Sequence, residues 1–269
     1  MESRGIVYLI SGNKHAVVLV ASVASLRKHW DGDVAIVGTD EAGYTLAQQV
    51  ASDERLRVRA IKMDHGNYRR NSGYLNKTRI NSVVPFDSTV FLDADTIVRG
   101  DITEVFPRGD EMVLTSWGGW VTTGNMMSNR IRKWSKVEPE RVERMTSISW
   151  PAINTGVFGF TKRTVFMDDW YDVTKQNVIF ICDEIAAQIM YPDYPVRLLT
   201  DKYNCSPFVG QNKDDSVVWH FHGKKHCKPA AIDKWWPTYE ECLSENYADI
   251  NEWTPAGDKR LRRYLEVGV

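Results

Sequence analysis

Strand-like and helix-like segments alternate over the first sixty residues, and this rhythm is the feature that most constrains the fold. Three short apolar runs, at residues 6–10, 34–37 and 56–61, have the length and composition of buried strands. Two helix-like segments, residues 15–30 and 44–52, separate them. This alternation predicts a mainly parallel sheet with helices on both faces. In such sheets, ligands bind beyond the C-terminal ends of the strands.

The later elements are expected to extend the same domain. Further strands are predicted at residues 89–92, 112–117 and 157–160, and further helices at residues 73–84, 165–173 and 183–190. Residues 118–150 are interpreted as a segment that leaves the sheet and covers the ligand-binding site. We expect one domain over residues 1–230, with residues 231–269 as a C-terminal helical extension packed on it.

Two carboxylates follow directly after one of these predicted strands. The apolar run Val90-Phe91-Leu92 ends at Asp93, and Asp95 stands two residues further on. In an extended segment, residues i and i+2 point to the same side. The two side chains can then hold one hard divalent cation together and leave coordination positions open for phosphate oxygens. This chemistry suits neutralisation of the diphosphate leaving group of an activated sugar.

The same Asp-x-Asp spelling occurs a second time, at Asp31-Gly32-Asp33. We interpret that copy as a turn from a helix into a strand, which turn chemistry explains fully. The spelling alone is therefore not specific, and two solvated carboxylates in a loop are the alternative for Asp93 and Asp95.

Three other stretches could complete a site around the acid pair. Lys77 lies on the helix before the Asp93 strand and can reach a diphosphate as a point charge. Asn154-Thr155-Gly156 opens a strand with a hydrogen-bonding side chain and a glycine that permits close approach. Asp183-Glu184 opens a helix. The ordinary alternatives are a surface lysine, a strand-edge turn, and acidic residues favoured by the helix dipole.

A stretch near residue 220 combines imidazoles, a glycine and lysines. His220 and His222 share one face of an extended segment, so either could supply a third metal ligand. Lysines that could clamp phosphates follow closely, at Lys224, Lys225 and Lys228. A solvated basic loop with a packed histidine is the alternative.

Taken in order, these stretches resemble the motifs of glycosyltransferase family 8, the glycogenin and galactosyltransferase-like group with the GT-A fold. The resemblance covers roughly residues 5–229, and five motifs in order are more specific than any one of them. It implies a Rossmann-like, mixed and mainly parallel sheet and a metal-dependent transferase. It further implies a nucleotide diphosphate sugar as donor, usually a uridine diphosphate sugar, with Mn²⁺ or Mg²⁺, a carbohydrate or glycosylated acceptor, and retention of configuration.

The resemblance also implies roles for individual positions. Asp93, Asp95 and His220 would be the metal ligands. Asp183 and Asn154 would line the pocket around the transferred sugar as catalytic residues, together with Glu184, where the family often has glutamine. The implied donor-binding set is Tyr8, Ser11, Asn13, Lys77, Asp93, Ala94, Asp95, Gly223, Lys225 and Lys228. The family's usual lysine six positions after the histidine is His226 here, which leaves Lys225 or Lys228 for the phosphate role.

Tryptophans are frequent, and indole faces stack well on sugar rings. Some of them are therefore expected to line an acceptor groove, with core packing as the alternative: Trp117, Trp120, Trp134, Trp150, Trp235, Trp236 and Trp253.

Two other function classes remain open. A sugar-nucleotide pyrophosphorylase would need a glycine-rich basic loop after the first strand, and residues 11–15 are too sparse for one. A non-catalytic nucleotide-sugar or carbohydrate binding protein could share the fold.

Charge and composition limit the binding partners and the cellular location that we expect for this protein. The net charge is −1, from 34 basic and 35 acidic residues, so no basic field points to nucleic acid or an anionic membrane. The four cysteines are scattered without a Cys-x-x-Cys pair, which suits reduced thiols. Neither a signal peptide nor a membrane-length apolar run is recognisable, and we expect a soluble, cytoplasmic protein.

Overall fold

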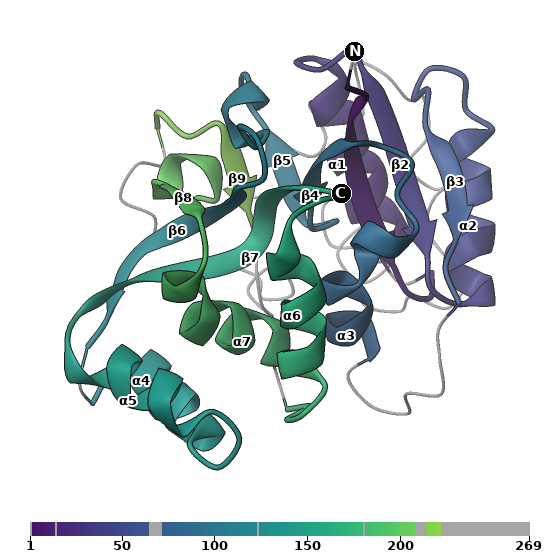
Figure 1. The fold of residues 1–269 in the computed structure, drawn as a ribbon. Coiled ribbons are helices and arrows are strands. Elements are labelled where there is room, and N and C mark those ends of the chain that lie inside the picture. The colour runs from purple at the N-terminus through teal and green to yellow at the C-terminus, as the bar shows by residue number, and fades with distance from the viewer. Residues whose placement is uncertain are drawn as a thin grey trace, which may run out of the picture.

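A seven-stranded sheet in the order β3-β2-β1-β4-β7-β6-β8 forms the centre of the molecule (Figure 1). The computed structural model describes residues 2–13, 15–64, 72–122, 124–179, 181–207 and 214–221. The strands of the sheet are β1 (Arg4–Ile10), β2 (Asp33–Gly38), β3 (Arg59–Lys62), β4 (Ser88–Leu92), β6 (Met112–Val121), β7 (Trp150–Thr161) and β8 (Val196–Leu199). A second, two-stranded sheet consists of β5 (Thr96–Val98) and β9 (Val218–His220).

Most neighbouring strands of the large sheet run parallel. The strand β1 pairs with β2 and β4, β2 pairs with β3, and β6 pairs with β8, all in parallel register. Only β7 is antiparallel to its neighbours in this sheet, β4 and β6. The prediction of a mixed, mainly parallel sheet is therefore confirmed. All residues of β4 are buried, as expected for a central strand that is covered on both faces.

Helices cover both faces of this sheet. One face carries α1 (Ala16–Arg27), α2 (Glu41–Ala51) and the β5–β9 ribbon. The other carries α3 (Ser72–Thr78), α6 (Val165–Thr174) and α7 (Cys182–Met190). The connection between β6 and β7 contains α4 (Met126–Ile131) and α5 (Pro139–Ser147), which pack on each other and contact α7 (Figure 1).

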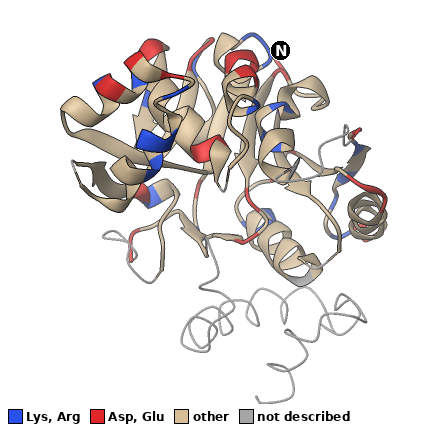
Figure 2. Ribbon diagram, turned by 90° about the horizontal axis from the view of Figure 1, so that it is seen from below, with Lys and Arg blue, Asp and Glu red and all other residues tan. Residues whose placement is uncertain are grey.

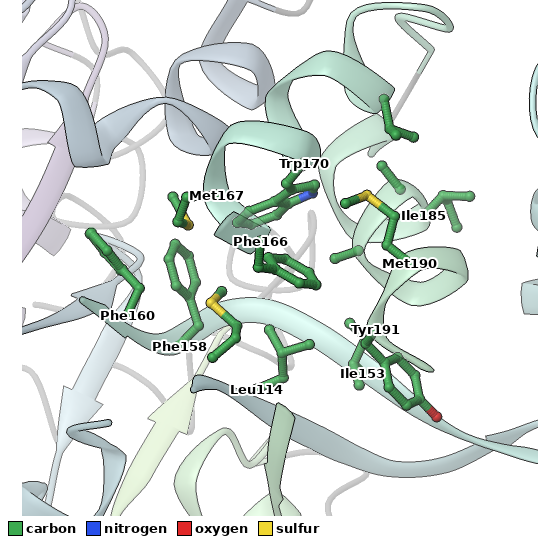
Figure 3. Close-up of a cluster of buried hydrophobic side chains, with 14 of the residues drawn as sticks. Leu114, Ile153, Phe158, Phe160, Phe166, Met167, Trp170, Ile185, Met190 and Tyr191 are labelled. Carbon is green, nitrogen blue, oxygen red and sulfur yellow. The ribbon is translucent and has the colours of Figure 1, made fainter. Parts of the chain in front are cut away.

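An aromatic cluster joins β7 to α6 and α7 (Figure 3). The Phe158 ring stacks on Phe91 of β4 with centroids 4.7 Å apart and meets the edge of Trp170 at 5.3 Å. Burying such a side chain stabilises the fold by about 1.5–3 kcal/mol. The indole nitrogen of Trp170 also donates to the backbone oxygen of Asp183, at 2.7 Å. The core thereby fixes the start of α7 relative to β7.

The structure corrects several element boundaries and adds strands that were not predicted. The strand β7 starts at Trp150 rather than at residue 157, because β6 continues to Val121 and supplies it with pairing partners. The predicted helix at residues 73–84 ends at Thr78 and is followed by a 3-10 turn at Ile80–Ser82. The short strands β5 and β8 were missed, since neither shows an alternating pattern long enough to detect.

The charges of the described chain are interspersed over the elements (Figure 2). Arg197 of β8, for example, contacts Glu104 at 2.9 Å and Glu111 at 2.7 Å. None of the helices in the described part of the chain has the length and apolar character that a membrane span requires. The predicted extension at residues 231–269 lies outside the described residues.

Candidate active site

Two acidic residues and one histidine meet at the C-terminal end of β4. The strand ends at Leu92, and Asp93 and Asp95 follow in the turn that leads into β5. His220 is the last residue of β9, and the pairing of β9 with β5 places it opposite Thr96. Its Nε2 atom lies 3.2 Å from Asp95 Oδ1 and 3.6 Å from Asp93 Oδ2.

The acid pair is brought together by this turn and not by an extended strand as predicted. Thr96 Oγ1 donates to the backbone oxygen of Asp93 at 2.8 Å and closes the turn. The backbone nitrogen of Asp93 donates to Gly156 of β7 at 2.8 Å and anchors its start. Both carboxylates can therefore face one point although neither belongs to a strand.

These three side chains form a donor set that suits a divalent metal ion. One ligand atom from each of Asp93, Asp95 and His220 lies within 4.8 Å of the others, and this is the group of this kind found among the described residues. Two carboxylates and one imidazole are ligands that Mn²⁺ accepts readily. The residues present therefore fit the metal that the sequence resemblance implies.

The charges of the triad depend strongly on one another. Burial raises the pKa of Asp93, and the nearby charges of Lys77 and His220 only partly oppose this rise. Burial by itself would lower the pKa of His220, but Asp95 and Asp93 raise it above its ordinary value. A metal ion at this position would have to displace a proton from His220 Nε2.

Lys77 joins the acid pair to the start of α7. Its side chain comes from α3 and is buried, with Nζ 2.9 Å from Asp93 Oδ1 and 3.5 Å from Asp183 Oδ2. It also donates to the backbone oxygen of Thr155, at 3.3 Å. Burial alone would lower the pKa of Lys77, but the carboxylates of Asp93 and Asp183 raise it, so the ammonium remains charged. A surface position, the ordinary alternative for this lysine, is excluded.

Asp183 presents a buried carboxylate to the same centre. It lies in the first turn of α7 and is 1% exposed. Its Oδ2 atom accepts from Thr155 Oγ1 at 2.8 Å, whereas Oδ1 has no hydrogen-bond partner in the described part of the chain. An unpartnered buried carboxylate oxygen is costly and calls for an explanation, of which a catalytic role is one.

Asn154 and Glu184 form a second pair beside Asp183. The amide nitrogen of Asn154 donates to Glu184 Oε2 at 2.6 Å, and its amide oxygen accepts from the backbone nitrogen of Gly156 at 2.9 Å. Burial and the neighbouring Asp183 raise the pKa of Glu184 to about 7. The protonation of Glu184 is therefore expected to change near neutral pH.

A cavity of about 450 Å³ opens in front of the acid pair. Its volume falls in the range of pockets that bind small molecules and cofactors. The sequence-predicted residues Ser11, Lys77, Asp93, Ala94 and Asp95 all line it. The wall also includes Leu9 and Ile10, which belong to the segment from Tyr8 to Asn13 that was predicted to face the nucleotide. Residues that the sequence did not single out complete it: His15, Gly73, Tyr74 and Phe91.

Tyr8 and Asn13 do not belong to the cavity wall. Tyr8 has no exposed surface, and its hydroxyl accepts a hydrogen bond from Ser22 of α1 at 3.1 Å. The side chain of Tyr8 lies on the face of β1 that α1 covers, two residues before Ile10, which does reach the cavity at the end of the strand. A side chain without exposed surface cannot face a nucleotide, so the prediction for Tyr8 is wrong. Asn13 is exposed in the loop before α1 and is not among the lining residues.

Some predicted residues cannot be placed. His222, Gly223, Lys225 and Lys228 lie outside the described residues, so their expected phosphate contacts remain predictions.

The loop after β1 is engaged by a carboxylate. Asp40, which caps the start of α2, accepts from the backbone nitrogen of Gly12 at 2.9 Å and from Ser11 Oγ at 2.8 Å. A phosphate-binding loop needs such donors free for its anion. This arrangement argues further against the pyrophosphorylase alternative.

Two important residues were missed or misread at the sequence level. A Cβ atom on Gly156 would lie 2.1 Å from Cε1 of His220, so this glycine makes room for the imidazole. Asn204, which follows a 3-10 turn at Asp201–Tyr203, contacts both His220 and Asn154. No local pattern marks Asn204, because all its side-chain partners are distant in the sequence.

Comparison with solved structures identifies the fold. The bifunctional glycosyltransferase WbbM superposes with a TM-score of 0.64 and 13% identity, over 94% of this chain and 51% of that one. The fold is that of glycosyltransferases. The galactosyltransferase LgtC, solved with donor and acceptor sugar analogues, gives a TM-score of 0.62 at 14% identity, over 93% of this chain and 98% of LgtC. GlyE from Streptococcus pneumoniae gives 0.58 at 15%, over 91% of this chain and 63% of GlyE.

These likenesses confirm the predicted glycosyltransferase fold. The chain spans about half the length of WbbM. By sequence, no protein-family model and no curated protein matches the chain. An active-site mutant of LgtC, in which glutamate replaces glutamine, also matches, with a TM-score of 0.59 at 16% identity over 93% of this chain and 98% of that one.

Proposed function

We propose that this protein is a metal-dependent glycosyltransferase that moves a sugar from a nucleotide diphosphate sugar to an acceptor hydroxyl. The observation that carries the proposal is the convergence of Asp93, Asp95 and His220 with Lys77 and Asp183, beside a cavity that Asp93, Asp95 and Lys77 line. The convergence occurs on a glycosyltransferase fold and at the C-terminal end of a parallel strand, where such folds bind ligands.

Asp93, Asp95 and His220 would hold a manganese or magnesium ion. The chemistry that such an ion supplies is neutralisation of the diphosphate as it leaves. Lys77 adds a permanent positive charge at the same side of the cavity, because its ammonium remains protonated beside Asp93. Both effects stabilise charge that develops in the transition state, which is the most productive use of fixed charges.

Asp183 would act on the sugar. During transfer the bond between the sugar carbon and the phosphate oxygen breaks, the diphosphate takes the electron pair, and the acceptor oxygen bonds to the sugar carbon. The buried carboxylate of Asp183, whose Oδ1 atom has no hydrogen-bond partner among the described residues, would stabilise positive charge at the sugar carbon. The acceptor proton passes to the departing phosphate oxygen. Asn154 and Glu184 would bind the sugar beside it.

The donor is proposed to be a uridine diphosphate sugar, transferred with retention of configuration. Both details derive from the family resemblance of the motifs. Ser11 and the apolar wall formed by Leu9 and Ile10 would face the nucleotide. Retention corresponds to attack from the face that the diphosphate vacates.

The acceptor is proposed to stack on Trp120. This residue is 57% exposed and lines a second cavity of about 260 Å³, next to Asp201. Trp120 pairs with Pro151, three residues along β7 from Asn154, or about 10 Å at strand spacing. The other tryptophans of the described chain are buried or half-buried, so Trp120 is the one that offers an open indole face.

One assay tests the proposal. The protein is incubated with nucleotide diphosphate sugars and Mn²⁺, and release of free nucleotide is measured with and without a panel of sugar acceptors. Release that is lost in Asp95→Ala would support the transferase. Donor binding detected by thermal shift, without release from any donor, would support the binding-protein alternative. No binding of any nucleotide would exclude the donor site itself.

A further inference from the structure

Asn204 lies between the two halves of the proposed site. Its side chain is 1% exposed and contacts the metal-ligand half through His220 and the sugar half through Asn154. The distances are 2.8 Å from Asn204 Oδ1 to His220 Nδ1, and 3.1 Å from Asn204 Nδ2 to Asn154 Oδ1. One amide therefore spans groups that come from β9 and β7.

The surroundings fix the orientation of this amide. Its nitrogen faces Thr115 Oγ1 at 2.8 Å and the backbone oxygen of Asn154 at 3.0 Å. The Thr115 hydroxyl donates to the backbone oxygen of Val157 at 2.7 Å, so it accepts from Asn204. A flipped amide would direct its oxygen at acceptor oxygens that cannot donate. Asn204 Oδ1 is consequently the atom that faces the imidazole.

This orientation places a hydrogen on Nδ1 of His220. An amide oxygen can only accept, so His220 Nδ1 donates to it. The other ring nitrogen, Nε2, points at Asp95 and Asp93 and is hydrogen-bonded to Asp95. It becomes a metal ligand when an ion takes the place of the hydrogen on Nε2, while Nδ1 keeps its own. Metal-binding histidines require this arrangement, in which the second ring nitrogen is held by a hydrogen bond.

Gly156 restricts the ring from the opposite direction. A Cβ atom there would collide with His220 Cε1, and the backbone nitrogen of Gly156 donates to Asn154 Oδ1 at 2.9 Å. The imidazole therefore occupies a slot that is bounded by Gly156 and closed by Asn204. Gly156 and Asn204 also orient the amide of Asn154, because both donate a hydrogen bond to its Oδ1 atom.

We propose that Asn204 is a positioning residue that sets the tautomer of the metal ligand His220 and, with the same amide, aligns Asn154 for the sugar. The inference rests on the proposed function for the roles of these two partners. It extends that function by assigning a single residue that couples the metal half of the site to the sugar half.

The hydrogen on Nδ1 is measured directly by ¹⁵N-histidine NMR on protein in the presence of Mg²⁺ and uridine diphosphate. The signals of His220, one of six histidines, are assigned by their loss in His220→Gln. In the unmodified protein we expect hydrogen on Nδ1. In Asn204→Leu we expect the hydrogen to move to Nε2, toward Asp95. An unchanged tautomer in Asn204→Leu would overturn the inference.

Metal binding supplies the second measurement. Titration of Mn²⁺ in the presence of uridine diphosphate is followed by the electron paramagnetic resonance signal of the free ion. Loss of such a supporting contact weakens metal binding by about 10- to 100-fold, and we expect this for Asn204→Leu. Asn204→Asp keeps an acceptor for His220 Nδ1 and should retain the affinity to within about threefold, while transfer is lost because its donors to Asn154 are gone.

Gln188→Leu is the matched control. Gln188 is a fully buried amide that accepts from the backbone nitrogen of Ile153 at 2.9 Å and donates to Pro151 at 3.1 Å, without touching His220 or Asn154. Its loss should lower stability but leave the His220 tautomer and Mn²⁺ affinity unchanged. If the control changes the tautomer as Asn204→Leu does, the effect is general loosening and the inference fails. If the unmodified protein binds no Mn²⁺, the proposed metal site and this inference both fail, whereas Mn²⁺ binding that is unchanged in Asn204→Leu overturns the inference alone.

Discussion

The ammonium of Lys77 lies 2.9 Å from a carboxylate oxygen of Asp93, although the two residues come from α3 and from the end of β4. Asp183 lies 3.5 Å from the same nitrogen. One buried cation thus balances two carboxylates, one at the end of β4 and one in the first turn of α7. The proposed metal ion would add charge of the same sign on the other side of Asp93, so the two cations can substitute for each other in part.

Lys77→Met should destabilise the metal-free protein by about 3–5 kcal/mol, because it leaves buried carboxylates without their partner. Chemical denaturation measures the change. Added Mn²⁺ should recover part of the loss in the variant, since the ion neutralises Asp93. Lys62→Met is the control: Lys62 contacts Glu41 at 2.6 Å on the surface and should have little effect. Equal destabilisation in both variants would contradict the assigned role of Lys77.

Asp95→Asn should reduce transfer about a thousandfold or more, as expected when about 4 kcal/mol of charge stabilisation is removed. The chain contains its own control in Asp31, which has the same Asp-x-Asp spelling but is exposed and pairs with Arg57 at 3.0 Å. Asp31→Asn should keep full activity and full Mn²⁺ affinity. Steady-state kinetics of both variants tests whether transfer requires the carboxylate at the metal site, or whether any Asp-x-Asp sequence in the chain affects it.

Glu184 is expected to make stability and activity depend on pH near neutrality. Burial and Asp183 raise its pKa from the ordinary 4.5 to about 7, so the folded state binds this proton more tightly than the unfolded state. Its contribution is therefore fully present below about pH 4.5 and is lost as the pH rises through about 7.

Glu184→Gln keeps an acceptor for Asn154 and removes the titration. The free energy of unfolding of the variant should depend less on pH between 5 and 7 than that of the unmodified protein, as a rough window set by the pKa shift. Its kcat/KM should lose the matching inflection. An inflection that persists in Glu184→Gln would assign the titration to another group.

Gly156→Ala tests whether the imidazole needs the space that glycine leaves. The added methyl would lie 2.1 Å from His220 Cε1 and must push the ring aside. We expect a stability loss of about 1–3 kcal/mol, as for other overpacked sites, together with loss of Mn²⁺ binding. Gly100→Ala is the control, because its added methyl meets only Val217 at 3.7 Å. Retained Mn²⁺ affinity in Gly156→Ala would show that His220 is not a required ligand.

The sequence predicted the parts of this molecule that are encoded locally. The alternation from Ile6 to Ile61 predicts the parallel half of the sheet, and the carboxylates after Leu92 lie at its C-terminal edge as expected. The position of Lys77 also followed, because a helix that precedes a parallel strand packs beside its end.

Contacts between distant segments could not be predicted in this way. The partners of Asn204 are 16, 50 and 89 residues away in the sequence, and they meet through the pairing of β6 with β7 and the bridge between Cys205 and Trp219 of β9. The prediction for Tyr8 failed for a different reason. Tyr8 belongs to a strand that the sequence predicted, but α1 covers its side chain, and the pattern of β1, apolar on both faces, does not reveal this packing.

Trp120→Ala tests the acceptor side and separates it from the donor side. Loss of one aromatic contact to a sugar ring is expected to cost about 0.5–1.5 kcal/mol, so the KM for the acceptor should rise up to about tenfold. Release of nucleotide to water, which needs only the donor half, should remain unchanged. The control is Ile148→Ala, since Ile148 is 61% exposed and belongs to neither cavity. An unchanged acceptor KM in Trp120→Ala would move the acceptor away from β6, whereas a parallel loss of donor hydrolysis would mean that Trp120 supports the fold of the site and not the acceptor.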